Sequence, residues 1–455
     1  MQKFSYKNTK LQNNHQLFSD DILLTPNWYV FQQLPIGRLY NSLPLKELAS
    51  LLPEKAVKGA GAPSWFTNEG MIGLCFLKPY LSLSDQKLVE RLNTDWSLQL
   101  FCGRLFNTGQ MIKDRNLPSR IRQYLSYHLN IDNFQEILID YWKDYIHEEH
   151  CILLDATVYE SYIKYPTDSK LLWDCCVWVF EGMFEICKEL KIKRPRSKYK
   201  EQQLKQVSFQ KTKKKTYKIT RRRIKALLYL LNKGIAQLEV ILGNYGIELN
   251  EDFNKKLSIV KTILFQQQYL YDHIGDQLAG RIVSLFKPYL RPIVRGKENK
   301  RVEFGAKAHI RQVDGVNIID KLSFDPYNEA KHLKSSIIKH EKQFGKCHQV
   351  GIDKIYGTNE NRKYMTENDI YNCLPRKGKA AKDEGQRNQL RSALGKARAT
   401  KLEGSFGNEK NHYSLKKVKA RNQHTEIIWI LFGVMTANAV RISKRKDNKI
   451  VRQAA

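Results

Sequence analysis

Apolar side chains recur at helical spacing in the first part of the chain. The phrase DQKLVERL, which follows Ser84, puts its apolar residues on one face of a helix, and the serine can cap the free N–H groups at its start. Apolar phrases at 71–83 and 96–105 flank this segment. The pattern predicts a compact, all-helical module over residues 36–125.

Strand-like patterns begin at residue 151. The phrase CILLDATVYE combines a short apolar run with β-tolerant residues, which predicts a short buried strand that ends at Asp155. Two more strand-like phrases, 302–310 and 316–324, are separated by an Asp-Gly turn signal and predict a hairpin. A brief run, QVGI, predicts another short strand just before Asp353.

Helical periodicity fills most of the interval between the first strand and the hairpin. It predicts two long antiparallel helices, whose apolar positions are Leu228, Leu231, Ile235, Leu238 and Leu242 in the first and Val260, Ile263, Leu264 and Tyr271 in the second. After the hairpin, the pattern predicts a helix at 329–344, a polar linker at 376–391, and helices at 394–413 and 425–441. These elements predict a mixed α/β core that is interrupted by a helical block.

Net charge indicates the class of partner. The 455 residues include 77 Lys and Arg against 46 Asp and Glu, a formal net charge of +31, which favours a polyanion such as nucleic acid. The densest basic segment is 191–225, and its tightest clusters are Lys213, Lys214, Lys215 and Arg221, Arg222, Arg223. This segment predicts phosphate contacts that do not depend on DNA sequence, with a solvated linker as the alternative.

Cysteine usage and hydropathy indicate the compartment. The eight Cys residues form no CxxC pair, which favours free thiols in a reducing cytoplasm. The N-terminus lacks the apolar core of a secretion signal, and the strongest apolar run, 427–435, is shorter than the roughly 20 residues of a membrane span. We therefore expect a cytosolic protein that does not enter membranes.

Three acids stand where oxygen ligands can converge. Asp155 and Asp353 each follow a short apolar run, so both carboxylates are expected at the C-terminal edge of a sheet. Glu403 is expected on a helix, with Lys410 on the same face two turns away. Carboxylates without His or Cys suit Mg²⁺ or Mn²⁺ better than zinc.

The phrases around these acids resemble those of a known family. They are IGLCFLKPYLSLSDQKLVERLNTDWSLQLFCG (72–103), LLDATVYESYIKYPTDSKLLWD with Asp155, DKIYGTNENRKYM with Asp353, and LEGSFGNEKNHYSLKKVKAR with Glu403. In this order they resemble bacterial insertion-sequence transposases of the DDE type, in the IS-five-like superfamily with the helical N-terminal domain of the InsH type. The resemblance covers almost the whole chain.

The resemblance implies that Asp155, Asp353 and Glu403 are the catalytic residues and hold the metal, as two Mg²⁺ or Mn²⁺ ions in each active site. Asp155 would bridge the ions, and Asp353 and Glu403 would each complete one coordination sphere. Lys410 would hold a phosphate of the DNA near the metals.

One motif departs from the family. Related transposases often carry the pattern Y-(2)-R-(3)-E-(6)-K, in which Glu403 and Lys410 fit. The tyrosine and arginine positions here hold Lys396 and Ala399. Arg398 and Lys401 carry charge next to these positions and are therefore the DNA-binding candidates on this face. 

The resemblance also implies the fold. It predicts an α/β fold, with a ribonuclease-H-like catalytic core, a mostly helical insertion, and an all-helical N-terminal domain before the core. The expected parts are an N-terminal domain for DNA-end binding or dimerisation at 1–125, the first part of the core at 126–175, a basic helical insertion at 176–290, the remainder of the core at 291–441, and a basic C-terminal tail at 442–455.

The function that the resemblance implies is metal-dependent cleavage at the ends of an insertion sequence, followed by transfer of the 3′-hydroxyl ends into target DNA. Its partners would be double-stranded DNA, as terminal inverted repeats and as target, and a second copy in a synaptic homodimer. The expected location is the bacterial cytoplasm, at the nucleoid. Two alternatives stay open: a DNA-binding derivative without catalysis, and a metal-dependent nuclease on the same core.

Overall fold

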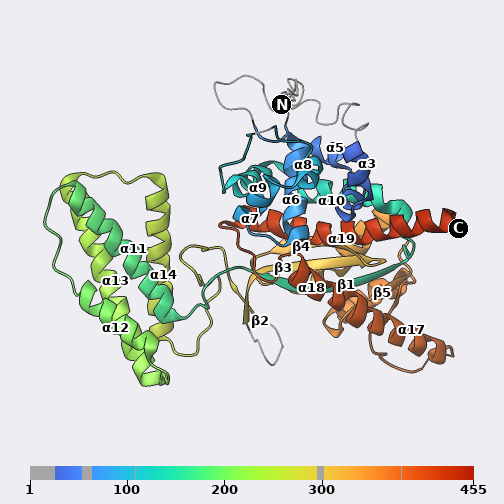
Figure 1. The fold of residues 1–455 in the computed structure, drawn as a ribbon. Helices are drawn as coiled ribbons and strands as arrows, with labels where there is room; N and C mark the ends of the chain where they lie inside the picture. Colours follow the sequence, from blue (N-terminus) through green and yellow to red (C-terminus); the bar gives the residue numbers. More distant parts are fainter. Residues whose placement is uncertain (1–25, 54–63, 108, 295–301, 381, 455) are drawn as a thin grey trace, which may run out of the picture. The chain divides into compact units, whose positions relative to one another are not determined.

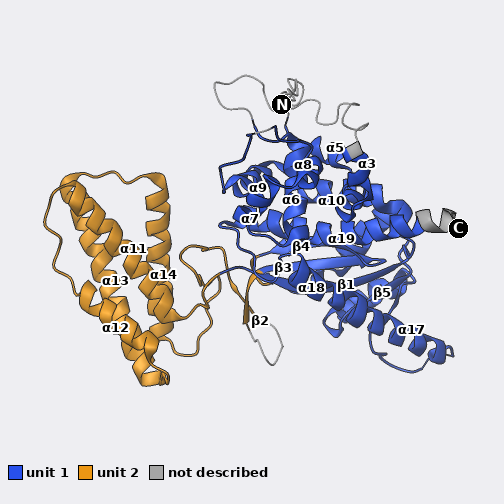
Figure 2. Ribbon diagram, in the orientation of Figure 1, with its two compact units in different colours: residues 1–162, 306–323, 327–455 blue, residues 163–305, 324–326 orange. Residues whose placement is uncertain are grey.

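The computed structural model describes residues 26–53, 64–107, 109–294, 302–380 and 382–454. The chain divides into two compact units (Figure 2). Unit 1 lies within residues 1–162, 306–323 and 327–455, and unit 2 comprises residues 163–305 and 324–326. The helical segment after the first strand is therefore a unit of its own, with its own apolar core.

The sheet contains parallel and antiparallel strands, as a mixed α/β fold requires. Its strands are β1 (Cys151–Glu160), β2 (Pro292–Val294), β3 (Val302–Val313), β4 (Val316–Ser323), β5 (Gln349–Gly351) and β6 (Tyr371–Asn372). Its order is β2-β3-β1-β5-β6, and β4 also pairs with β3. The β5 strand is parallel to both β1 and β6, whereas β3 is antiparallel to β4 and β2.

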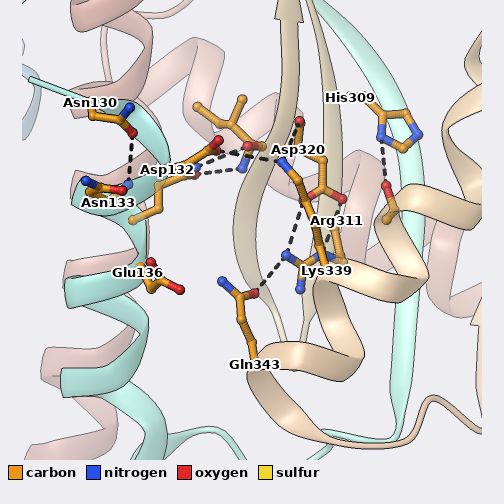
Figure 3. A network of polar contacts seen from close by, with 12 residues as sticks. Asn130, Asp132, Asn133, Glu136, His309, Arg311, Asp320, Lys339 and Gln343 are labelled. Atoms are coloured by element: carbon orange, nitrogen blue, oxygen red, sulfur yellow. Dashed lines mark hydrogen bonds and ion pairs between the residues drawn. The ribbon is translucent and has the colours of Figure 1, made fainter.

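The predicted hairpin is confirmed as β3 and β4. Asp314 and Gly315 form its turn, and both have positive φ angles, 44° and 79°. Two positive φ values in a two-residue turn match the right-handed twist of paired strands, which explains why Asp-Gly stands here. Buried polar groups also join these strands, because Arg311 on β3 lies between Asp320 on β4 and Gln343 (Figure 3).

Helices cover the sheet of unit 1 (Figure 1). They are α3 (Pro26–Gln33), α4 (Pro35–Tyr40), α5 (Leu45–Ala49), α6 (Asn68–Leu81), α7 (Asp85–Leu92), α8 (Trp96–Phe101), α9 (Leu117–His128), α10 (Ile131–Trp142), α15 (Leu333–Phe344), α16 (Asn359–Glu367), α17 (Glu384–Ala397), α18 (Glu403–His412) and α19 (Gln423–Ala454). The N-terminal helices belong to the same unit as the sheet, since α19 packs against α6, α9 and β4.

Some predicted helix boundaries are confirmed and others are wrong. The predicted helix after Ser84 is α7, and the Ser84 hydroxyl accepts a hydrogen bond from the Lys87 N–H. The polar linker expected at 376–391 is wrong in its second half, where α17 begins at Glu384 and packs on β5 and β6. The last helix was expected to end at residue 441, but α19 continues through the basic tail, where Arg445 donates hydrogen bonds to two backbone carbonyls.

Unit 2 consists mainly of helices α11 (Asp168–Glu189), α12 (Tyr199–Lys211), α13 (Tyr217–Tyr245) and α14 (Glu251–Asp272). The predicted antiparallel pair is confirmed as α13 and α14. Lys261 pairs with Glu239 at 2.6 Å near one end, and Arg221 donates to the Tyr271 carbonyl at 3.0 Å near the other. Gly234 lets α13 approach α11, because a Cβ there would lie 2.8 Å from the Phe180 ring.

In the part of the chain that the structure describes, two helices, α13 and α19, are long and apolar enough to cross a membrane by length and composition alone. Most of the apolar stretch of α19 is buried within unit 1, and a little under half of that of α13 is buried. Such helices also form the cores of soluble proteins, so this observation is weak evidence for a membrane span.

Candidate active site

Two of the predicted acids lie at the same level of the sheet. The parallel pairing of β1 with β5 ends where Leu153 faces Gly351, and Asp155 and Asp353 each follow two residues later. The two carboxylates therefore leave the same edge of the parallel ladder. One detail of the prediction is wrong: Asp155 lies inside β1 and not after it, because the strand has β3 as its other neighbour and continues to Glu160.

Glu403 approaches from a different part of the chain. It is the first residue of α18 and follows a π-helical turn that runs from Arg398 to Leu402. One nitrogen of Arg398, Nη1, lies 2.7 Å from Asp155 Oδ2 and 3.0 Å from Glu403 Oε1. The arginine thus joins two acids that are almost 250 residues apart.

All three acids act on this one arginine. Burial lowers the pKa of Arg398, but the negative charges of Asp155, Asp353 and Glu403 outweigh it and raise the pKa above the usual value. Burial also raises the pKa of Asp155 to about 6, although the charge of Arg398 opposes this shift. Arg398 therefore contacts two of the predicted acids directly, and the charge of the third, Asp353, also acts on it.

The π-helical turn explains how Arg398 reaches Glu403. Hydrogen bonds in a π-helix span five residues and not four, so the turn contains one extra residue. The pattern expected from the resemblance has its arginine four residues before the glutamate, whereas Arg398 is five residues before Glu403. The extra residue of the turn compensates for this difference and leaves Ala399 exposed.

Helix α18 follows the same face of β1 beyond Asp155. Side chains alternate between the two faces of a strand, so Thr157 and Tyr159 share the face of Asp155. Lys410 donates a 2.8 Å hydrogen bond to the Thr157 hydroxyl, and its ammonium group lies 5.9 Å from the centre of the Tyr159 ring. Lys410 therefore lies along the strand that carries Asp155.

The donor chemistry of the acids fits a hard divalent cation, since carboxylate oxygens are the preferred ligands of Mg²⁺ and Mn²⁺. Among the described residues, no group of three or more His, Cys, Asp or Glu side chains is already arranged as a metal site. The position between Asp155 and Glu403 instead contains the positive charge of Arg398. A metal ion there would have to displace the guanidinium.

Two groups near the acids were not expected from the sequence. Glu329 contributes to the raised pKa of Asp155 and pairs with Lys307 at 2.7 Å. The Tyr356 hydroxyl lies 2.8 Å from His309 Nε2 on β3. Burial lowers the pKa of His309 to about 3, so this histidine is neutral. No spacing in the sequence links these residues to Asp155, because only the packing of separate segments brings them near it.

The predicted DNA-binding residues have different surroundings. Lys401 is exposed and pairs with Glu148 at 3.3 Å. Arg223 is buried in unit 2, where its guanidinium donates to the side chains of Gln202 and Gln206. Arg223 therefore joins α13 to α12, and this use of its donors was not expected from the sequence.

The rest of the basic cluster in unit 2 is more accessible. Arg222, Lys213, Lys214 and Lys215 are exposed. Lys215 donates a 2.7 Å hydrogen bond to the Thr212 carbonyl, and Arg221 stacks on the Tyr271 ring. The exposed members form the part of the cluster that a phosphate backbone could reach.

The eight cysteines are free thiols and six of them are buried. Burial raises the pKa of Cys151 to about 11 and that of Cys347 to about 12, so these thiols stay protonated and poorly reactive at neutral pH.

Comparison with known families gives one match. Residues 31–124 match the family described as a transposase domain, DUF772. Comparisons with curated proteins and with solved structures found no match. The matched segment lies within the expected N-terminal domain, residues 1–125, and it supports a transposase-family protein that processes DNA.

Proposed function

We propose that the chain is a DDE transposase that cuts DNA at the ends of its own insertion sequence and joins the freed ends to target DNA. The observation that carries this proposal is the contact of Arg398 with both Asp155 and Glu403, at the sheet edge that Asp353 shares with Asp155. The transposase domain at 31–124 supports it independently, since that match does not include any of the three acids.

The proposal includes a ribonuclease-H-like core. Its support is a mixed sheet in which β1 and β5 are parallel neighbours that place Asp155 and Asp353 at one edge. Unit 2, which enters the chain between β1 and β3, corresponds to the helical insertion of that core. 

The reaction has two steps at phosphorus. In the first, a water oxygen attacks the phosphate, the bond to the 3′ oxygen breaks, and a 3′-hydroxyl and a 5′-phosphate are produced. In the second, that 3′-hydroxyl attacks a phosphate of the target, and a target 3′ oxygen leaves. Asp155, Asp353 and Glu403 would hold two Mg²⁺ or Mn²⁺ ions, which activate the attacking oxygen and stabilise the leaving one.

The basic residues near the acids would orient the DNA. Lys410 lies beside Thr157 and presents a point charge along β1, where it can bind a phosphate next to the acids. Arg398 would exchange its two carboxylate partners for a phosphate when the metals bind, because its planar guanidinium suits both kinds of anion. Lys401 and the exposed basic residues of unit 2 would contact the backbone without reading sequence.

The experiment compares wild type with Asp155→Asn, Asp353→Asn and Glu403→Gln. Purified protein is incubated with Mg²⁺ or Mn²⁺, a duplex that contains an end of the element, and a target plasmid. Each variant should lose at least about 100-fold in cleavage while its DNA affinity, measured by gel shift, changes little. Glu148→Gln is the matched control, because Glu148 is an exposed acid that pairs with Lys401.

The products distinguish the proposal from its alternatives. Cleavage with joining to the plasmid supports a transposase. Cleavage without joining supports a nuclease on the same core. Specific binding of the ends without metal-dependent cleavage supports a derivative that has lost catalysis.

A further inference from the structure

A buried network of polar side chains lies between α18 and the sheet, with Glu409 at its centre. Only 1% of Glu409 is exposed. Its Oε1 atom accepts a 2.6 Å hydrogen bond from Asn317 Nδ2 on β4, and its Oε2 atom accepts a hydrogen bond from the Tyr159 hydroxyl on β1. The proposed reaction does not use this carboxylate, so its burial needs another explanation.

The network also includes Ser405, one turn earlier on α18. The Ser405 hydroxyl accepts hydrogen bonds from Asn317 Nδ2 at 2.8 Å and from Gln312 Nε2 on β3 at 3.2 Å. It donates its own proton to the Leu402 carbonyl at 2.6 Å. Two successive turns of α18 are therefore attached to β1, β3 and β4 by buried hydrogen bonds.

The strand side of the network is itself held in place by α19. The Asn317 N–H donates to Asn438 Oδ1 at 2.9 Å, and Asn438 Nδ2 donates to the Asn317 carbonyl at 2.7 Å. Both asparagines are buried, at 2% exposure each. Asn317 therefore presents its side chain to α18 from a fixed position.

The network and the candidate active site use different sides of α18. Ser405 follows Glu403 by two residues, and two residues rotate a helix by about 200°. Ser405 and Glu409 are four residues apart and share the buried side, whereas Glu403 and Lys410 are seven apart and share the other. The hydrogen bonds on the buried side thus decide where Glu403 and Lys410 lie over β1.

Hydrogen bonds fix this register more strictly than apolar packing does. Apolar attraction has no direction, but a buried donor or acceptor that loses its partner destabilises the fold. A shift of α18 by one residue would leave Glu409, Ser405 and Asn317 without their partners. Lys410 also ties α18 to β1 through Thr157, but on the proposed function Lys410 binds a phosphate. The contacts of Glu409 are then the ones that remain.

We propose that Glu409 is a positioning residue, which through Tyr159 and Asn317 holds α18 in the register where Glu403 and Asp155 contact the same guanidinium. It acts through Glu403 and touches neither metal nor DNA. The inference rests on the proposed function, since that function makes Glu403 a metal ligand.

The Mn²⁺ affinity of the full-length chain, measured by calorimetry without DNA, tests this role. Glu409→Leu removes both hydrogen bonds and should raise the Mn²⁺ dissociation constant at least about 10-fold. Glu409→Gln also removes the charge, but its amide can accept from Asn317 and donate to the Tyr159 oxygen, so its affinity should stay within about 2-fold of wild type. The difference between the two variants separates the hydrogen bonds from the charge.

Gln135→Leu is the matched control for a loss of stability. Gln135 is buried on α10, and its side chain bonds the N–H and carbonyl of Ile319 on β4 at 2.8 and 3.1 Å. This variant also removes two buried hydrogen bonds from β4, but it should leave Mn²⁺ affinity unchanged. Wild-type affinity in Glu409→Leu, or an equal loss of affinity in Gln135→Leu, would overturn the proposal.

Tyr159→Phe keeps the test decisive if Glu409→Leu does not fold. It removes one hydroxyl and keeps the ring, and it should weaken Mn²⁺ binding about 3-fold. Wild-type affinity in this variant would exclude the positioning role.

Amide hydrogen exchange separates a failure of this inference from a failure of the proposed function. A wild type that does not bind Mn²⁺ would contradict the proposed function. The register of α18 can still be measured in the metal-free chain, where exchange at 403–412 should be at least about 10-fold faster in Glu409→Leu than in wild type or Gln135→Leu. Equal exchange rates in all three proteins would contradict the anchoring of α18 by Glu409.

Discussion

Arg398 is the residue on which the candidate active site depends. Its Nη1 atom contacts both Asp155 and Glu403, so it neutralises the acids while no metal is bound. On the proposed function, a metal ion competes with this guanidinium for the same oxygens. We expect Arg398→Gln to tighten Mn²⁺ binding several-fold, as measured by isothermal titration calorimetry, because the competing cation is removed. Lys401→Gln should not change Mn²⁺ affinity, and weaker binding to the Arg398 variant would contradict the competition.

Glu409 makes a separate prediction about pH. Burial raises its pKa from 4.5 to about 7, although hydrogen bonds from Tyr159 and Asn317 oppose the shift. Between pH 4.5 and about 7, the Glu409 carboxyl is protonated in the native state but ionised in the unfolded state. Its contribution to the free energy of unfolding is therefore fully present at low pH and falls as the pH rises towards 7. 

The test compares urea unfolding of wild type and Glu409→Gln. The variant should gain up to about 3 kcal/mol relative to wild type as the pH rises from 4.5 to 7.5, because glutamine does not ionise. Glu367→Gln replaces an exposed carboxylate and should show no such trend. A difference between Glu409→Gln and wild type that does not vary with pH would exclude the titration of Glu409 as the cause.

At the scale of elements, the π-helical turn is the feature that sets the register of α18 against β1. Its extra residue should be removable, because deletion of the exposed Ala399 converts the turn into an ordinary α-helical turn and keeps Arg398 on the face of the glutamate. We expect this deletion to cost less than about 1 kcal/mol of unfolding free energy. Deletion of Ser392, inside regular helix α17, should cost more, since it rotates the preceding half of α17 away from β5 and β6.

The sequence predicted most elements correctly because their causes are local. The cap at Ser84, the Asp-Gly turn of the hairpin and the helical periodicity of α13 all depend on neighbouring residues. The start of α17 was missed because its polar sequence becomes a helix only by packing on β5 and β6. 

The candidate site was predicted only in part, for the same reason. Asp155, Asp353 and Glu403 were named from their settings and from the family resemblance. The bridge through Arg398 requires the π-helical turn, and hydrogen-bond spacing within a helix has no signature in the sequence. Glu329 acts on Asp155 only because tertiary packing brings the two together, and Tyr356, three residues after Asp353, comes near Asp155 in the same way.

At the scale of the whole molecule, the positive charge should appear as a salt dependence of DNA binding. Lys213 and Lys214 are exposed members of the basic cluster of unit 2. Replacing both with Gln should lower the slope of log affinity against log salt by up to about two, equally for all DNA sequences. Lys255→Gln is the control, because Lys255 already pairs with Glu251. An unchanged slope in the double variant would mean that the cluster is a solvated surface.

The insertion of unit 2 between β1 and β3 also affects how the protein is made. About 140 residues separate the end of β1 from the start of β3, although the two strands are neighbours in the sheet. At the usual speed of translation, β1 leaves the ribosome on the order of ten seconds before its first partner strand. Unit 2 has an apolar core formed by its own helices and can fold during that interval. During that interval β1 has neither of its neighbouring strands, so its apolar side chains and its backbone edges are exposed to aggregation.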